Sequence, residues 1–268
     1  MMSTSLEHRD SVATSTATFR FYADLNDFLR PDRRGVGASH RLSTPTTVKD
    51  ATESQGVPHV EVGAVLVDGE ATTWNRPLHG GERVAVYPRF CSLEPDVATA
   101  PPLPDPRRFV LDVHLGTLAR RLRLLGFDTW YREHADDDEL AAVSAVDGRI
   151  LLTRDVGLLK RSVVVHGAWV RATDPDRQVL EVVDRCCLGS RLAPFTRCVR
   201  CNGLLGPADP DRVADTVPAG ARREHEAFRE CGDCHQVYWR GSHATALEAV
   251  VDRVRRHVGG LDGVWGDG

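Results

Sequence analysis

The sequence lacks the features that would place it in a membrane, in a secretory pathway or on DNA. No apolar run approaches the roughly 18 to 20 residues needed to span a bilayer. Residues 1–17 are rich in serine and threonine and have no apolar core, which argues against a signal peptide and predicts a disordered leader. Lysine occurs only at Lys49 and Lys160, a compositional bias toward arginine. The net charge of −4 is far from the positive excess of a dedicated DNA-binding protein.

The cysteine pattern also argues against a secreted disulfide framework. There are seven cysteines, an odd count, and four of them form two Cys-x-x-Cys pairs. This arrangement favours a reduced, cytoplasmic protein with a metal site. We expect the three remaining cysteines, Cys91, Cys186 and Cys187, to be buried apolar residues.

With 268 residues, 41% of them hydrophobic, the chain is long enough for two or three small domains with ordinary cores. A stretch rich in proline, from Pro95 to Pro106, has the composition of a semi-rigid linker. The sequence predicts six parts: a disordered leader (1–17), a ubiquitin-like β-grasp domain (18–92), the linker (93–106), a parallel-sheet α/β domain (107–190), a zinc ribbon with a helix (191–258) and a flexible tail (259–268).

The first domain is predicted from a strand pair, a helix and further strands in that order. Thr47 can cap a helix over 48–55, and an Asp68-Gly69 turn separates strands at 63–67 and 70–74. Other strands are expected at 19–22, 39–43 and 83–87. The order is that of a ubiquitin-like β-grasp fold, and "V-D-G" followed by "L-x-x-G-E-R-V-x-V-Y-P" resembles its sulfur-carrier branch. Such carriers act through a free C-terminal Gly-Gly, whereas this chain continues. An interaction or substrate-guiding role is therefore favoured over sulfur transfer, with simple support of the neighbouring domain as the alternative.

Residues 107–190 alternate between apolar strands and helices, which predicts a parallel, doubly wound sheet. Strands are expected at 109–111, 127–131, 150–152 and 163–165, and helices at 115–125, 139–146 and 175–187. A final helix is expected at 242–258, with Ala246, Leu247, Val250, Val251 and Val254 on its apolar face.

Two of the predicted strands lead into aspartates. Asp112 follows 109–111 directly, and Asp155 follows 150–152 after two residues. Ligand sites in open α/β sheets lie at the carboxyl ends of the strands, where carboxylates suit Mg²⁺ or Mn²⁺. A third acid is expected from 136–138, with Asp137 as first choice, Asp138 as the alternate and one of the three serving only as a helix cap. The pattern predicts metal-dependent phosphodiester hydrolysis.

Several polar residues near these acids are candidates for binding substrate. Arg154 could contact a phosphate, Thr153 could hydrogen-bond a water or a carboxylate, and Lys160 could touch the nucleic-acid backbone, although a surface lysine is the simpler reading. Three arginine groups could also hold a nucleic-acid backbone, with solvated helix faces as the alternative: Arg107-Arg108, Arg120-Arg121-Arg123 and Arg222-Arg223.

The two cysteine pairs, Cys198-x-x-Cys201 and Cys231-x-x-Cys234, are separated by 29 residues. Four thiolates in two such pairs predict a closed tetrahedral zinc site of structural type, which adds folding energy rather than chemistry. His235 is not expected to be a ligand because four thiolates suffice. Phe228, Tyr238, Trp239 and Arg240 could stack on bases, but aromatic packing of a small ribbon is the commoner reason.

Four ordered motifs carry a resemblance to a known family: "F-V-L-D-V-H-L-G-x-L-A-R-x-L-R-x-L-G-F-D-T", "R-I-L-L-T-R-D-x-G-L-L", "R-C-V-R-C-N-G-L-L" and "C-G-D-C-H-Q-V-Y-W-R-G-S-H". They resemble the Mut-seven C-terminal RNase family, a PIN-like nuclease domain fused to a zinc ribbon, whose bacterial members also carry an N-terminal ubiquitin-like domain. The resemblance implies metal-dependent cleavage of RNA. It matches Asp112 and Asp155 to the PIN acids and the Asp137–Asp138 pair to the intermediate one, whereas the fourth acid of many PIN domains has no obvious counterpart.

Three functional hypotheses follow. The first is an endoribonuclease with a structural zinc, a catalytic Mg²⁺ or Mn²⁺ and single-stranded RNA as its partner. The second is a non-catalytic RNA- or ribosome-binding adaptor that uses the zinc ribbon and the β-grasp domain. The third is a scaffold that binds a protein partner through the β-grasp domain.

Overall fold

The computed structural model describes residues 15–42, 46–91, 96–209, 213, 216–225, 227–239 and 242–262. The predicted leader, apart from residues 15–17, and the last six residues of the predicted tail lie outside this part. The chain divides into two units, one containing residues up to 89 and 93–100, the other containing 90–92 and everything from 101 onward. Within the described chain, no helix combines the length and the apolar composition that a membrane crossing requires.

The first unit is built on a five-stranded sheet with the order β2-β1-β7-β4-β5. The first and last long strands, β1 and β7, run parallel in the middle, and the other pairs are antiparallel. This is the β-grasp arrangement, as predicted. The strands are β1 (Thr16–Phe21), β2 (Ala38–Arg41), β4 (Val62–Val67), β5 (Glu70–Ala71) and β7 (Arg83–Pro88), with β3 (Thr46–Thr47) and β6 (Pro77–Leu78) forming a separate pair.

Local sequence explains these elements. Strand β1 alternates exposed and buried residues, so Phe19 and Phe21 enter the core from one face of the sheet. Helix α1 (Val48–Ser54) begins where predicted, because the Thr47 side chain accepts a hydrogen bond from the Asp50 amide at 3.2 Å. Short 3-10 turns complete the unit at Ala23–Phe28, Pro31–Arg33 and His59–Glu61.

The second unit contains a four-stranded, fully parallel sheet with the order β11-β10-β8-β9. Its strands are β8 (Arg108–Leu111), β9 (Asp128–Tyr131), β10 (Ile150–Thr153) and β11 (Gly167–Trp169). The chain moves outward from β8 to β9 and then crosses back to β10, so the strand order reverses between β8 and β10. Such a reversal opens a crevice at the carboxyl ends of the two central strands.

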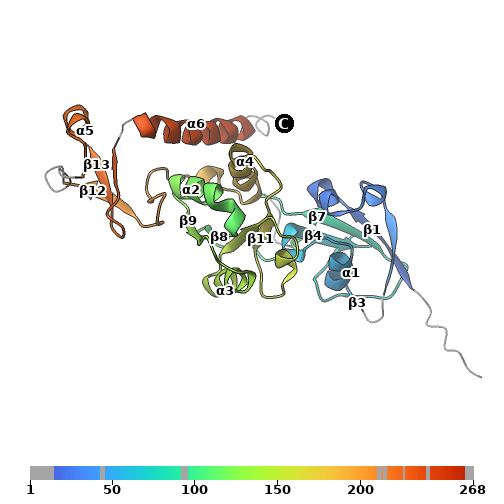
Figure 1. Ribbon diagram of the computed structural model, residues 1–268. Helices are drawn as coiled ribbons and strands as arrows, with labels where there is room; N and C mark the ends of the chain where they lie inside the picture. The colour runs from blue at the N-terminus through green and yellow to red at the C-terminus, as the bar shows by residue number, and fades with distance from the viewer. Residues whose placement is uncertain are drawn as a thin grey trace, which may run out of the picture. The chain divides into compact units, whose positions relative to one another are not determined.

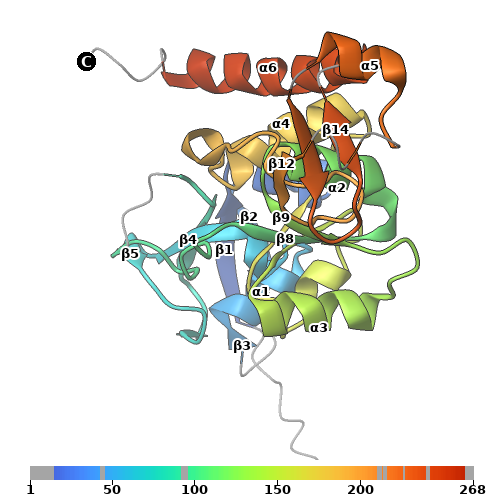
Figure 2. The same ribbon diagram turned by 90° about the vertical axis from the view of Figure 1, so that its left-hand side faces the viewer.

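Helices cover both faces of this sheet. Helices α2 (Gly116–Leu124), α4 (Pro175–Arg185) and α6 (Ser242–Asp262) lie on one side, and α3 (Asp137–Asp147) lies on the other (Figures 1 and 2). Leu111 and Leu152 join the core beneath α2 and α4. Because successive strand residues point to opposite faces, Val110 and Leu151 face α3, which packs on β8 and β10. On α6, Val251 and Val254 are buried as expected, whereas Ala246 is exposed.

The prediction of a strand at 163–165 is wrong. Val163 and Val165 are 51% and 49% exposed, and only Val164 is buried. The 3-10 turn at Leu158–Lys160 and the turn that follows it occupy this stretch, and the Val164 amide bonds to the Arg161 carbonyl. Pairing with β10 starts later, where Leu151 aligns with Gly167. Here the tertiary path of the chain overrides the β-propensity of three valines.

The prediction for the unpaired cysteines holds for one of three. Cys186 is 2% exposed and packs in the core. Cys91 and Cys187 instead form a disulfide across a sequence separation of 96 residues, and Cys91 is exposed. The expectation that both are buried apolar residues is wrong, because a long-range approach of two cysteines leaves no mark in local sequence.

The remainder of the second unit is a small antiparallel sheet followed by the last helix. Its strands are β12 (Leu205–Ala208), β13 (Phe228–Cys231) and β14 (Val237–Trp239), in that order, with helix α5 (Ala219–Glu224) between β12 and β13. Val213, Val217, Phe228 and Val237 form its core. Helix α6 continues to Asp262, so residues 259–262 of the predicted tail are helical.

Candidate functional site

Asp112 lies at the crevice where the strand order reverses, and three donors hold its carboxylate. The Oδ1 atom accepts the His114 amide at 2.9 Å. The Oδ2 atom accepts the Thr153 hydroxyl at 2.6 Å and the Arg154 amide at 2.7 Å, both from the neighbouring strand β10 and the residue that follows it. Each carboxylate oxygen can accept about two hydrogen bonds, so Oδ1 keeps one position for a further ligand. The three hydrogen bonds fix the orientation of this carboxylate, and the residue is only 6% exposed.

Asp155 is joined to Asp112 through Thr153. The Thr153 hydroxyl donates to Asp112 and accepts the Asp155 amide at 2.9 Å. Asp155 is exposed, and its Oδ1 atom accepts the Gly157 amide at 2.7 Å. A single buried threonine therefore links the loops that carry the two strand-end acids.

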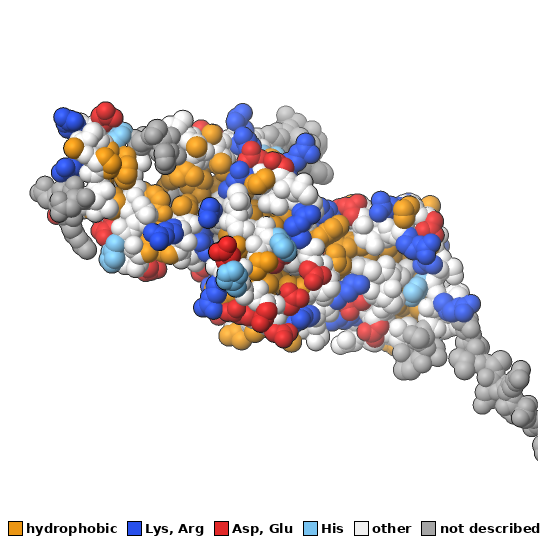
Figure 3. Space-filling view, in the orientation of Figure 1, with side chains coloured by type: hydrophobic (Ala, Val, Ile, Leu, Met, Phe, Trp, Pro, Cys, Tyr) orange, Lys and Arg blue, Asp and Glu red, His pale blue; other side chains and the backbone are white. Residues whose placement is uncertain are grey.

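The three acids at the start of α3 have different surroundings. Asp136 caps the helix by accepting the Glu139 amide at 2.8 Å, which confirms that one of the three is a cap. Asp138 is ion-paired with Arg161, and Asp137 is the exposed first residue of the helix. Acidic side chains gather over α3 (Figure 3). Across the described residues, however, the acids form no group of three whose oxygens approach within 4.8 Å of one another.

The other predicted substrate contacts lie around this edge in varied settings. Nη1 of Arg154 donates to the carbonyls of Val170, Arg171 and Ala172, with the shortest bond at 2.7 Å, so part of this guanidinium supports the chain after β11. Lys160 is half-buried at the end of its 3-10 turn, and Arg120 is exposed on α2.

The arginines that could hold a nucleic-acid backbone differ in their burial and in their ion pairing. Arg123 is 5% exposed, and its guanidinium hydrogen-bonds to carbonyls within the second unit, so it cannot bind a nucleic acid at the surface. Arg121 pairs with Asp176 at 2.6 Å, whereas Arg222 and Arg223 are exposed on α5.

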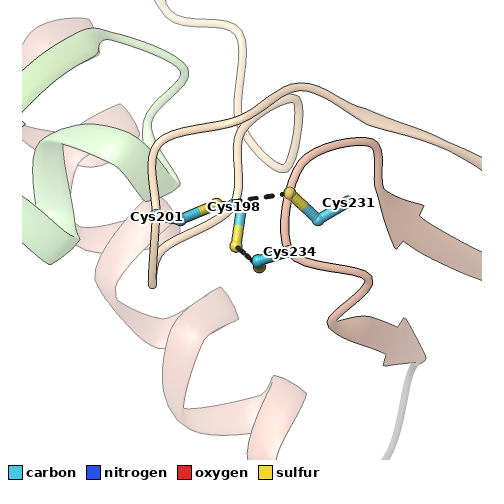
Figure 4. A group of neighbouring side chains, drawn as sticks. All are labelled: Cys198, Cys201, Cys231 and Cys234. Carbon is cyan, nitrogen blue, oxygen red and sulfur yellow. Dashed lines mark hydrogen bonds between the residues drawn. The ribbon is translucent and has the colours of Figure 1, made fainter.

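The four paired cysteines form one compact cluster. Their sulfurs all lie within 4.8 Å of one another. The Cys198 and Cys234 sulfurs are 3.7 Å apart, and those of Cys201 and Cys231 are 3.4 Å apart (Figure 4). Tetrahedral zinc with Zn–S bonds of about 2.3 Å separates its sulfurs by about 3.8 Å. The cluster therefore fits a zinc ion.

The two cysteine pairs have the same backbone design. In each, the residue after the second cysteine, Asn202 or His235, has a positive φ and donates its amide to the carbonyl of the first cysteine. This turn brings both sulfurs of a pair to one side. The His235 side chain faces Glu230 at 2.8 Å, in agreement with the expectation that it is not a ligand.

Electrostatics differ between the thiols. Burial opposes ionisation of Cys198, but hydrogen bonds from the Tyr238 hydroxyl, 3.1 Å away, and from backbone amides lower the pKa of Cys198 to about 7. Burial and neighbouring sulfurs raise the pKa of Cys201 to about 12, despite the amide of Gly203. Binding of zinc by this set therefore releases protons from the more basic thiols. The sequence does not predict the contact of Tyr238 with a cysteine sulfur.

The first cysteine pair also docks onto the edge of the parallel sheet, a contact that sequence reasoning missed. The Asn202 side chain accepts the Thr129 amide and donates to Asp128, both at 2.9 Å. Arg123 donates to the Thr129 carbonyl and to the carbonyls of residues 199 and 200. Asn202 thus satisfies a backbone donor on edge strand β9. The sequence gives no sign of this contact, because Arg123 stands among other arginines and its burial is visible only in the structure.

The fold and the site define a class: a parallel α/β domain with acids at its switch point, followed by a four-cysteine ribbon. Residues 107–251 match the family described as the Mut7-C RNAse domain. The chain belongs to this family. Residues 14–94 match the family described as Mut7-C ubiquitin, which agrees with the β-grasp unit. No curated protein matches the chain.

Proposed function

We propose that this protein is a metal-dependent endoribonuclease that hydrolyses phosphodiesters of single-stranded RNA, with Mg²⁺ or Mn²⁺ as its cofactor. Membership of the Mut7-C RNAse family supports the reaction class. The observation that carries the proposal is the carboxylate of Asp112, oriented by three donors at the strand-order reversal with one acceptor position left on Oδ1.

The proposed ligands are Asp112, Asp155 and one acid from the start of α3. Asp137 is favoured over Asp138, because Asp138 is engaged by Arg161. Carboxylate oxygens are the donors that hard divalent cations prefer. Among the described residues, these acids follow the carboxyl ends of the strands but form no close group of three carboxylates. Carboxylates that no cation neutralises repel one another, which agrees with this spacing.

A bound Mg²⁺ or Mn²⁺ ion supplies an activated water and offsets charge on the phosphate. The chain's own residues orient the reactants. Thr153 is a positioning residue that holds Asp112. The remaining N–H groups of Arg154, together with Lys160 and Arg120, are proposed to hold the RNA backbone.

The test is cleavage of a labelled 12-nucleotide single-stranded RNA in Mg²⁺ or Mn²⁺. We expect Asp112→Asn to lower activity by about 100-fold or more, because the amide removes a charged oxygen ligand. Asp50→Asn, which changes an exposed acid of α1 in the first unit, is the matched control and should leave the rate unchanged. If wild type cleaves no RNA with either ion, or if Asp112→Asn cleaves equally well, the proposal is wrong. RNA binding that persists without any cleavage would instead favour the adaptor hypothesis.

We further propose a cytoplasmic location, because the four cysteines of the zinc site must be reduced to bind the metal. The Cys91–Cys187 disulfide involves none of these four cysteines. The ubiquitin-like unit is the proposed contact for a protein partner.

A further inference from the structure

We propose that a second phosphate-binding pocket lies at the opposite end of the parallel sheet from Asp112, and that it holds the RNA backbone away from the site of cleavage. The role of RNA rests on the proposed function, whereas the pocket's affinity for phosphate does not. The pocket encloses about 260 Å³ at the amino-terminal ends of β8 and β9. Its charged lining consists of Arg107, Arg108, Arg191, Arg197, Asp105 and Asp128.

The lining has more positive than negative charge. Four arginines face two aspartates, and both aspartates are already engaged. Asp105 pairs with Arg191 at 2.7 Å. Asp128 pairs with Arg149 at 2.7 Å, and Arg197 approaches it only to 4.0 Å. Arg107 and Arg108 are therefore left to supply the excess charge.

Among the described residues, Arg107 and Arg108 hydrogen-bond to backbone carbonyls only. Arg107 donates to the carbonyls of Leu103, Pro104 and Cys186. Arg108 donates through Nη2 to the Asp147 carbonyl at 2.7 Å, while its Nε is buried and has no hydrogen-bond partner in the described chain. Carbonyls orient these guanidinium groups without neutralising them, so a phosphate in the pocket would supply the missing negative charge.

The electrostatics of Arg107 agree with this assignment. Burial, followed by the nearby charge of Arg191, lowers the pKa of Arg107. Asp105 offsets part of the repulsion between Arg107 and Arg191, and an anion in the pocket near these two guanidinium groups would offset more of it.

The position of the pocket favours RNA over a free nucleotide. Arg108 begins β8, and Asp112 follows its last residue. At about 3.3 Å per residue, the two ends of this strand are about 13 Å apart along a line that runs through the sheet, so a nucleic-acid strand that occupies both sites must follow a longer path around it. A trinucleotide cleaved near Asp112 is therefore too short to reach the pocket reliably, whereas a longer strand can occupy both sites. The pocket should contribute affinity only to longer RNA.

The experiment measures binding in the Asp112→Asn background, so that it does not depend on cleavage. The probes are a 12-nucleotide single-stranded RNA, a trinucleotide and AMP, each titrated over a range of NaCl concentrations. The test variant is R107Q/R108Q, and Arg107→Gln alone is a second variant in case the double variant is unstable. Arg177→Gln, which changes an exposed arginine of α4, is the matched control. Thermal unfolding and zinc content verify that each variant is folded.

We expect the test variants to bind the 12-nucleotide RNA about fivefold more weakly, and the trinucleotide unchanged. The slope of log K against log[NaCl] should become less negative by about 0.7 for each phosphate that the variant no longer neutralises. Weaker binding of AMP with unchanged binding of the 12-nucleotide RNA would show a phosphate pocket for free nucleotides and overturn the RNA role. Equal affinities and salt slopes for all probes overturn the pocket itself. If the nuclease assignment fails, the wild type will not cleave RNA, but the pocket variants will still bind the 12-nucleotide RNA more weakly than the protein with an intact pocket.

Discussion

At the scale of single residues, Thr153 organises the candidate site. It is fully buried at the end of β10, and its hydroxyl both donates to Asp112 and accepts the Asp155 amide. A hydroxyl is the smallest side-chain group that can do both. If Asp112 is a metal ligand, as proposed, a residue that hydrogen-bonds to it controls the orientation and the basicity of its carboxylate.

Replacing Thr153 by valine keeps the shape of the side chain and removes the hydroxyl. Under the proposed function, we expect Thr153→Val to raise the Mg²⁺ or Mn²⁺ concentration needed for half-maximal cleavage by about 10- to 100-fold, because Asp112 loses an orienting donor. Thr153→Ser restores the hydroxyl and should restore the metal dependence. A valine variant with unchanged metal dependence and the wild-type fold would show that Thr153 has no positioning role.

At the scale of elements, the edge strand β9 is covered by the first cysteine pair. An uncovered strand edge invites pairing with other chains. The Asn202 side chain can reach the Thr129 amide on β9 because the positive φ of Asn202, 78°, turns the backbone after Cys201. Asp128 is the charged partner at this junction, where it binds Asn202, Arg149 and, at longer range, Arg197.

The junction should weaken in acid. Burial alone would raise the pKa of Asp128, but hydrogen bonds from Arg149 and Asn202 outweigh it and hold that pKa below its ordinary value. A carboxyl with a depressed pKa in the folded state stabilises the protein above its unfolded pKa of about 3.9, and this stabilisation is lost as pH falls through the folded value. We expect the melting temperature of Asp128→Asn to be lower than that of wild type at pH 5, with the gap narrowing below about pH 4.

The measurement is thermal unfolding of both proteins at a series of pH values from about 5 to about 2.5, which spans the titration of the carboxyl. Acid would also displace any zinc that the four cysteines hold in either protein, so the informative quantity is the difference in melting temperature between variant and wild type at each pH. Asp32→Asn removes an exposed carboxylate that is paired with Arg30, and it serves as the control. A difference for Asp128→Asn that is constant over the whole range would contradict the prediction.

At the scale of the whole molecule, the two units have separate cores. Phe19, Val65 and Val86 belong to one, and Leu118, Leu152 and Val182 belong to the other. The cysteine cluster is part of the second unit, where it is tied to β9 through Asn202 and Arg123. Loss of zinc should therefore spread into the parallel sheet and leave the β-grasp unit unaffected.

We expect zinc removal by a chelator to increase amide hydrogen exchange in β12–β14 and in β9, with no change in β1 and β7. A structural zinc site contributes free energy of folding to the segment that holds it. Hydrogen exchange followed by mass spectrometry measures each segment separately. Cys234→Ser should reproduce the effect without a chelator, and re-addition of zinc to wild type should reverse it. Equal exchange changes in both units, or none, would contradict this separation.

Sequence alone predicted the features that depend on local pattern. The spacing of the four cysteines indicated their cluster, the Thr47 cap indicated α1, and the alternation of apolar strands and helices indicated the parallel sheet. These features can be predicted from sequence because a cap, a cysteine pair or an amphipathic segment is defined by residues a few positions apart.

Tertiary structure alone decided which distant residues meet. It placed the fourth strand at Gly167–Trp169, buried Arg123 beneath the ribbon, joined Cys91 to Cys187 and brought Arg108 and Arg191 to one pocket. It also selected Asp136 as the helix cap from three adjacent aspartates. Each outcome depends on the path of segments far apart in sequence, and a path of that kind is fixed by packing and burial rather than by local residue pattern.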